Sequence, residues 1–554
     1  MPHRVRLLAL LLLAPLLTLL AGCGGGGGNG RGPGGTGGVA FHCPAPQTRG
    51  WNGLRARLLD ASGRPTAEAA AAARFLGQAT FGPRQGDIVA LLDSGLDYGA
   101  WIDRQLALPA TRHRPLMAGD GRDERLLAWW QAVVHGDDQL RQRMAWALSQ
   151  LFVVSDRPDL LFNNQPAMAD YYDLLVTHAF GNFRDLLGAV TRHLVMGEYL
   201  SLKSSSKADP DTGQHPDENY AREVMQLFTI GLVQLAPDGT VRTDADGAPL
   251  PTYRQGDIEA LARTLSGWSS ANGWLWRYDW FRPMIPYPEH HDSGEKRFLG
   301  HTIPAGQTPE RDMEQALDIL FNHPNTGPFV ARRLIQRFTA SNPSPAYVAR
   351  VAAVFADNGQ GVRGDLAAVL RAVLLDPEAR QPGTAPGSGK LREPLLRVAQ
   401  LWRAFDACIE GHDYWRPYKD LLQAPLSAPS VFNFYSPGYR PPDLGGDPAL
   451  VAPEFQIVTD ASLTTSANKL FRMALGGYWN SEYELDVTPL LGLADDPPAL
   501  LGTLDLLLMS GDMPATMRQA LLTYLDGPAP ADPEERVRGL IYLILTSAQY
   551  AVQR

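Results

Sequence analysis

A dense cluster of chemically versatile side chains lies within QHPDENYAREVMQLFTIGL, Gln214 to Leu232. His215 and Glu218 stand three residues apart near its start. A histidine nitrogen and a carboxylate oxygen are ligands for several divalent metals, and either group can act as a general base. The cluster therefore predicts either a metal site or an acid/base pair at this point of the chain.

A second cluster, PEHHDSGEKRFLG at residues 288–300, holds the adjacent His290 and His291 followed by Asp292. If the two clusters meet in one cleft, metal-assisted or acid/base hydrolysis follows. In that hypothesis the catalytic residues are His215, Glu218, His291 and Asp292, and a divalent metal is held by His290, His291 and Glu218. Alternatively, Asp292 forms an ordinary turn in which its side chain bonds nearby backbone.

The first cluster also has a purely structural interpretation as the start of a helix. Pro216 suits the first helical position, because its missing amide would have no partner there. The spacing of Glu218 and Arg222 is that of a stabilising ion pair on one helix face. The structural polar network of this interpretation consists of Asn219, Tyr220, Arg222 and Glu223. His-x-x-Glu supplies two metal ligands at most, and the spacing differs from H-E-x-x-H, so we favour this structural role.

Two other stretches carry side chains that bind ligands in many proteins. Arg332, Arg333 and Arg337 lie in HPNTGPFVARRLIQRF, where we expect surface or ion-pair roles. The Pro-rich, aromatic segment Ala424 to Pro442 is expected to pack against the body, or to floor a pocket.

The amino terminus has the features of an export signal. Two arginines precede an apolar run from Leu7 to Leu20, which is shorter than the roughly 20 residues of a membrane-spanning helix. Leu20-Ala21-Gly22-Cys23 resembles the lipobox of bacterial lipoproteins, in which the cysteine is lipidated. We therefore expect a signal peptide at 1–22, a lipidated Cys23, and a flexible Gly-rich tether at 23–64. By the same resemblance, glycine after the cysteine favours the outer membrane.

Composition limits the remaining alternatives. Of the 554 residues, 45% are hydrophobic and the net charge is −9, so a large core is expected and a nucleic-acid partner is not. Cys43 and Cys408 remain after lipidation, either as a disulfide or as free thiols.

Apolar residues recur at three- and four-residue steps along nearly the whole body, 65–554, which predicts a mainly α fold. Long irregular loops and at most a minor β-hairpin interrupt the helices, and an internal boundary is placed near 377–390. The predicted helices span 67–79, 123–135, 138–154, 168–179, 183–196, 217–231, 255–268, 309–321, 326–338, 345–358, 363–375, 391–408, 453–475, 498–509 and 533–548. Asp-Gly pairs predict turns within 235–253, and the aromatic stretch 269–301 is expected to be a packed loop.

Several blocks in order resemble the bacterial family known as domain of unknown function 1800 (DUF1800). They are ARFLGQATFGP, RMAWALSQLFVVS, ENYAREVMQLFTIG, ARTLSGW, HDSGEKRFLG, HPNTGPFVARRLIQRF, KLREPLLRV and APSVFNF. The family pattern of the last block ends in Gly-Trp, where this chain has Asn433-Phe434. The resemblance implies an exported, largely helical protein without a settled activity, whose partner is a second exported protein similar to sulfatases or alkaline phosphatases.

Together these features predict a lipid-anchored helical protein of the cell envelope that binds or assists a partner in handling extracellular or periplasmic material. The alternative is the metal-dependent or acid/base hydrolase described above. Whether the chain is an enzyme is left open by the sequence.

Overall fold

The computed structural model describes residues 54–554 apart from 277, 382, 384–386, 408–417, 443–444, 446, 448, 476–484 and 528. All described residues belong to one compact unit. The lipobox, Cys23, Cys43 and Cys408 lie outside the described residues, so the lipid anchor and the state of the two thiols stay predictions.

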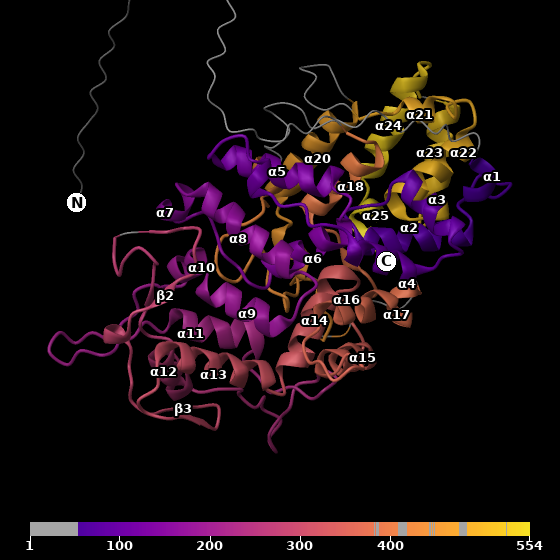
Figure 1. Cartoon of the computed structure of the whole chain (residues 1–554). Helices are drawn as coiled ribbons and strands as arrows, with labels where there is room; N and C mark the ends of the chain where they lie inside the picture. The colour runs from indigo at the N-terminus through magenta and orange to yellow at the C-terminus, as the bar shows by residue number, and fades with distance from the viewer. Residues whose placement is uncertain are drawn as a thin grey trace, which may run out of the picture. The chain divides into compact units, whose positions relative to one another are not determined.

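The predicted mainly α fold is confirmed (Figure 1). The helices of the first half are α1 (Arg55–Leu58), α2 (Ala67–Ala79), α3 (Gln85–Asp93), α4 (Tyr98–Ala107), η2 (Arg114–Leu116), α5 (Arg122–His135), α6 (Gln139–Ser149), α7 (Asp159–Phe162), α8 (Gln165–His178), α9 (Phe183–Arg192), α10 (Leu194–Tyr199), α11 (Asn219–Glu223), the π-helix η3 (Val224–Thr229), α12 (Gln255–Thr264) and η4 (Pro288–His290).

The second half continues in the same manner. Its helices are α13 (Pro309–Asn322), α14 (Thr326–Phe338), α15 (Pro345–Ala356), α16 (Leu366–Leu375), α17 (Pro377–Arg380), α18 (Pro394–Ala404), α19 (Tyr418–Leu421), η5 (Pro453–Ile457), α20 (Asp460–Leu475), α21 (Thr488–Leu491), α22 (Pro497–Leu504), the π-helix η6 (Asp505–Met509), α23 (Ala515–Asp526), α24 (Pro533–Leu545) and α25 (Ala548–Ala551).

Side chains that cap helices fix many of these starts. Thr66 accepts a hydrogen bond from the Ala69 amide at 3.2 Å and so fixes the start of α2, whose two ends are the predicted residues. The predicted helix 183–196 is instead two helices, α9 and α10. The break falls at His193, whose backbone is extended and whose ring nitrogen Nδ1 accepts from the Val195 amide at 3.2 Å.

Strands are few and short. In the described part of the chain they form three antiparallel pairs: β1 (Trp268–Ser269) with β2 (Ile285–Pro286), β3 (Lys296–Phe298) with β4 (His301–Ile303), and β5 (Lys390–Leu391) with β6 (Val552–Gln553). The first two pairs lie mostly in the stretch 269–301 that was predicted to be a loop, and Trp268 of β1 belonged to the predicted helix 255–268, which ends at Thr264 in the structure. The stretch is also less completely packed than expected, since Trp276 is 85% exposed. The turns predicted within 235–253 are confirmed by the bridges Leu235–Val241 and Thr243–Pro249.

The central helix of the body is α6, in which every residue but Arg141 is buried. A helix buried on nearly all sides needs partners all around it, and α6 packs against α4, α5, α8, α14 and α2. Trp146 from α6 meets Trp129 from α5 at a ring-centroid distance of 5.6 Å, and Trp130 meets Trp402 from α18 at 4.6 Å. These aromatic contacts join the beginning of the body to α18, some 270 residues later by number.

The start of the described chain packs against its carboxyl-terminal helices: α2 contacts the π-helix η6, and indigo and yellow ribbons lie side by side in Figure 1. Arg518 on α23 donates to the Gly63 and Pro498 carbonyls at 2.9 Å. Gly502 on α22 lies so close to the Gly63 carbonyl that a Cβ there would clash with it. The predicted boundary near 377–390 falls between α17 and β5, and β5 pairs with the last strand. Among the described helices, none has the length and apolar character that crossing a bilayer requires.

Candidate functional site

The first predicted cluster lies at the surface, and its helix starts later than expected. His215 is exposed, and α11 begins at Asn219 rather than at Pro216. The predicted ion pair is confirmed, because Arg222 Nη2 lies 3.0 Å from Glu218 Oε2. Glu218 Oε2 also accepts from Gln255 Nε2 at 2.9 Å, which holds α11 against α12.

The predicted polar network around this helix start forms only in part. Tyr220 is buried and shares a 2.6 Å hydrogen bond with the Thr191 hydroxyl. Asn219 is exposed, and its backbone amide donates to Asp217. Glu223 is buried, and its Oε2 has no hydrogen-bond partner among the described residues. Burial raises the pKa of this carboxyl, and the nearby charge of Arg222 only partly opposes that effect.

His291 belongs to a buried charge network that the sequence did not reveal. Its Nδ1 lies 2.9 Å from the Ser266 carbonyl oxygen, and its Nε2 lies 3.0 Å from Asp312 Oδ2. Lys296 Nζ also donates to Asp312, and Gln307 Nε2 donates to the other Asp312 oxygen at 2.9 Å. Burial acts to raise the pKa of Asp312, but the hydrogen bonds and charges of His291 and Lys296 outweigh it and hold that pKa below its usual range.

This environment determines what His291 can do. Both ring nitrogens of His291 face oxygen atoms of the protein, the Ser266 carbonyl and the Asp312 carboxylate. Both nitrogens are therefore engaged within the fold. The geometry gives His291 a structural role, in which it joins the β1 region to the start of α13.

Its neighbours are held by different partners. Asp292 accepts from Arg263 on α12, at 2.7 Å from Nε and 3.2 Å from Nη2, and it also accepts from the Gly294 amide in the predicted turn. The His290 ring stacks on Trp274 with centroids 3.7 Å apart. Its Nδ1 lies 3.2 Å from the Ser206 hydroxyl.

Glu218 of the first predicted cluster and Asp292 of the second are held by separate partners. Glu218 and Asp292 are attached to Gln255 and Arg263, eight residues apart on α12, which is roughly 12 Å along a helix axis at 1.5 Å per residue. No three His, Cys, Asp or Glu side chains among the described residues are grouped to hold a metal. The metal site therefore stays a prediction without a set of ligands.

A concave site, which we call the arginine groove, lies apart from the predicted catalytic and metal-ligating residues. It is a groove of about 750 Å³ formed by the end of α6, the π-helix η3 and the turn after it, α14, and the segment 429–438. This volume is in the range of ligand-binding clefts. Four of the eight sequence blocks contribute to its lining: RMAWALSQLFVVS, ENYAREVMQLFTIG, HPNTGPFVARRLIQRF and APSVFNF.

Three arginines of α14 line the groove: Arg332, Arg333 and Arg337. None of them forms an ion pair with a carboxylate among the described residues. Arg333 and Arg337 are one helical turn apart, where like charges repel each other. Burial, together with the charges of Arg337 and Arg332, lowers the pKa of Arg333 to about 9. Among the described residues, no carboxylate forms a direct ion pair with this cationic surface.

Aromatic rings hold these guanidinium groups in place. Arg333 lies over the Phe329 ring at 4.8 Å, and Arg337 lies over the Tyr435 ring at 4.6 Å. Arg337 is only 5% exposed and is one of the residues that line the groove. Two of the three guanidinium groups therefore lie on aromatic rings.

A network of hydrogen bonds centred on Gln150 supports this part of the groove. Gln150 at the end of α6 accepts from Asn433 Nδ2 at 3.2 Å and from the Tyr435 hydroxyl at 3.0 Å, and it donates to the buried Glu393 at 2.9 Å. Asn433 has a φ of +68°, a left-handed conformation that glycine adopts freely and that asparagine tolerates better than most residues. This conformation explains how Asn433 can occupy the place of the glycine in the family pattern.

From sequence, the three arginines were assigned surface or ion-pair roles, and the segment Ala424 to Pro442 was expected to pack against the body or to floor a pocket. Residues 429–438 of that segment do line the groove. The interpretation of Arg332, Arg333 and Arg337 as ion-pair residues is wrong for the described part of the chain, because none of the three has such a partner. The signal that the sequence did contain is the spacing of Phe329, Arg333 and Arg337 at four-residue steps on one helix face.

Comparison with known proteins identifies a family without identifying a function. A family model described as "Protein of unknown function (DUF1800)" matches residues 74–552. No curated protein and no solved structure matches the chain.

Proposed function

We propose, since this chain belongs to the DUF1800 family of proteins of unknown function, that it is an exported, lipid-anchored binding protein whose arginine groove receives an acidic segment of a second exported protein. Its role is then accessory, in handling extracellular or periplasmic material. The hydrolase hypothesis gains no support from the geometry of the predicted clusters.

The observation that carries this proposal is a row of three arginines without a carboxylate partner in the described residues. A buried or half-buried cation is costly unless an anion compensates it. Carboxylates of a bound segment would supply that compensation through charge-assisted hydrogen bonds. The groove is therefore complementary in charge to an acidic ligand.

The rim of the groove favours a protein segment over a small anion. Leu232, Val241 and Phe432 line the groove and are each about half exposed. Arginine and aromatic side chains beside exposed apolar ones are typical of the centres of protein interfaces. An acidic segment with apolar side chains would cover these residues and pair with the arginines.

The lipid anchor is supported by the sequence Leu20-Ala21-Gly22-Cys23 at the end of a short apolar run. We expect a Cys23→Ala variant to move from the membrane fraction to the soluble fraction, because it cannot be acylated. Fractionation after labelling with a radioactive fatty acid measures this directly. An unlabelled wild-type chain would contradict the anchor and leave the groove proposal untouched.

Groove binding is tested with the double variant Arg333→Gln/Arg337→Gln. We expect recovery of the partner from detergent-solubilised membranes to fall by at least about tenfold. Two lost charge-assisted hydrogen bonds of about 1.5–3 kcal/mol each are sufficient for this fall, since a tenfold change corresponds to about 1.4 kcal/mol. Quantitative pull-down, with mass spectrometry of the co-purifying chains, is the measurement.

The matched control is Arg297→Gln, which removes an arginine that is three-quarters exposed, is paired with Glu295 and lies outside the groove. This control should recover the partner as the wild type does. Equal recovery by the double variant would refute the proposal, as would a partner whose contacting segment carries no acidic residues.

A further inference from the structure

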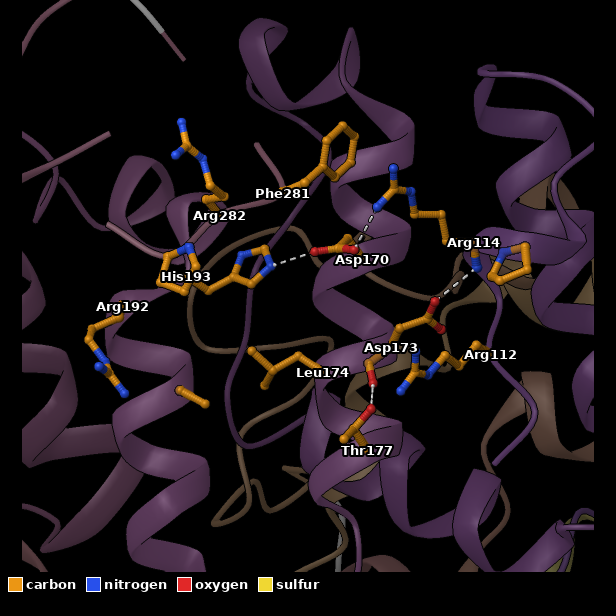
Figure 2. A pocket seen from close by; sticks show the side chains of 13 residues that line it. Arg112, Arg114, Asp170, Asp173, Leu174, Thr177, Arg192, His193, Phe281 and Arg282 are labelled. Carbon is orange, nitrogen blue, oxygen red and sulfur yellow. Dashed lines mark hydrogen bonds and ion pairs between the residues drawn. The ribbon is translucent and has the colours of Figure 1, made fainter. Parts of the chain in front are cut away.

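A second concave site lies on a different part of the body, at the cleft shown in Figure 2. Its volume is about 560 Å³. Four stretches line it: the connection from α4 to α5, helix α8, the junction of α9 with α10, and residues 281–283 of the loop that precedes β2. We call it the α8 cleft.

The α8 cleft holds more cations than anions. Its arginines are Arg112, Arg114, Arg192 and Arg282, against the carboxylates Asp170 and Asp173. Figure 2 shows Arg192 and Arg282 on one side and Arg112 and Arg114 on the other, with the side chains of α8 between them. Two sides of the same cleft thus offer positive charge to one ligand.

Two of these arginines are available to a ligand. Arg114 is paired with Asp170 at 3.0 Å, and Arg282 is paired with Asp279. Arg112 and Arg192 are exposed, and neither has an ion-pair carboxylate among the described residues. Arg192 only reaches the Gly188 carbonyl in its own helix, at 3.3 Å.

The cleft also contains hydrogen-bond acceptors, which a ligand made only of anionic groups would not need. Asp170 is held ionised, because hydrogen bonds and charges from His193 and Arg114 outweigh the effect of burial and lower its pKa. Burial raises the pKa of Asp173 to about 6, although the amides of His113 and Arg114 donate to it at 2.6 and 3.0 Å. Carboxylates beside arginines suit a ligand that has both hydroxyl donors and anionic groups.

The histidine of the cleft is not arranged for acid/base chemistry. His193 Nδ1 accepts from the Val195 amide at 3.2 Å, and Nε2 lies 3.4 Å from Asp170 Oδ2. Both nitrogens are therefore engaged within the protein. The cleft is suited to binding rather than to proton transfer.

An apolar face completes the site. Phe281 is 46% exposed, and the Arg114 guanidinium covers it at 3.6 Å from the ring centroid. Leu174 and Ala189 add aliphatic surface to the lining. A sugar ring presents hydroxyl groups at its edge and a C–H face that packs on such surfaces.

We propose that the α8 cleft binds a segment of an acidic polysaccharide, whose carboxylate or sulfate groups pair with Arg112 and Arg192 while its hydroxyls donate to Asp170 and Asp173. This site is independent of the arginine groove. A chain with both sites would hold a partner protein and an acidic polymer at once.

The test uses fluorescently labelled oligogalacturonate of defined length, with a neutral maltooligosaccharide of the same length and a poly-glutamate peptide as comparison probes. The protein is the full mature chain in detergent. We expect oligogalacturonate to bind and the Arg112→Gln/Arg192→Gln variant to lose at least about tenfold in affinity. Fluorescence anisotropy gives the dissociation constants, and circular dichroism checks that the variant is folded.

The matched control is Arg297→Gln, which removes an exposed arginine outside the cleft. This variant should bind oligogalacturonate as the wild type does. Oligogalacturonate binding and partner recovery are separate measurements on different variants, so failure of one proposal is distinguishable from failure of the other. Equal binding of the neutral probe, binding of poly-glutamate at least as tight as that of oligogalacturonate, an undiminished affinity of the Arg112/Arg192 variant, or no binding of oligogalacturonate would overturn the proposal.

Discussion

Replacement of Asp312 by alanine is expected to lower the free energy of unfolding by about 3–5 kcal/mol, the range for breaking a buried ion pair from one side. Asp312 and Lys296 are fully buried, and the carboxylate is the shared acceptor for Lys296, His291 and Gln307. Without it, the buried Lys296 has lost its counter-ion, and His291 and Gln307 have lost a hydrogen-bond partner. Urea unfolding followed by circular dichroism measures the loss.

The matched control for this variant lies in the same hairpin. Glu295 pairs with Arg297 at 2.9 Å, but both side chains are at least half exposed. Glu295→Ala should change the free energy of unfolding by about 0–1 kcal/mol, as exposed ion pairs do. If both variants lost a similarly small part of the free energy of unfolding, the Asp312 network would not stabilise the fold.

The second large effect is expected for Asp156→Ala, again about 3–5 kcal/mol. Asp156 is buried and accepts from Arg122 Nε and from Arg125 Nη2, each at 2.7 Å. Arg125 is buried as well, and it donates to the Pro425 carbonyl at 2.9 Å. The variant leaves a buried guanidinium without its counter-ion and loosens the chain around residue 425.

The Asp156→Ala change should also disturb the arginine groove, because residues 429–438, which line the groove, come directly after the segment around residue 425. Ser155 and the Asp156 amide bond the carbonyls of Ala428 and Leu426, at 2.7 and 2.8 Å. We expect weaker partner recovery from Asp156→Ala in addition to its lower midpoint in urea. Asp103→Ala, which removes an exposed ion pair with Arg371, is the control and should alter neither.

The helical character of most of the chain was predictable, because the three- to four-residue spacing of apolar side chains on one helix face can be read from neighbouring residues alone. Helices 67–79 and 326–338 have the predicted bounds. The predicted helix 217–231 does not, because its second half winds as the π-helix η3, a form that the apolar period does not distinguish from an α-helix. The helices α3, α4 and α23 were missed as well.

The candidate sites were less predictable, because charge compensation is a property of the folded chain. His291 and Asp292 were grouped because they are adjacent, yet one bonds Asp312 and the other bonds Arg263. Conversely, an arginine at position 333 looks like any surface arginine until the structure shows which carboxylates lie too far away to pair with it. Spacing along the chain identifies residues that share a helix face, but it does not identify the partners that are missing.

The packing of the start of the described chain against its carboxyl-terminal helices constrains how the protein folds. The Gly63 turn packs against Gly502 of α22 and accepts a hydrogen bond from Arg518. Both partners are synthesised more than about 430 residues after Gly63. Contacts between such distant stretches form slowly, since a long loop must close before they stabilise anything. A nascent chain emerging from its amino end therefore cannot complete this contact until synthesis is nearly finished.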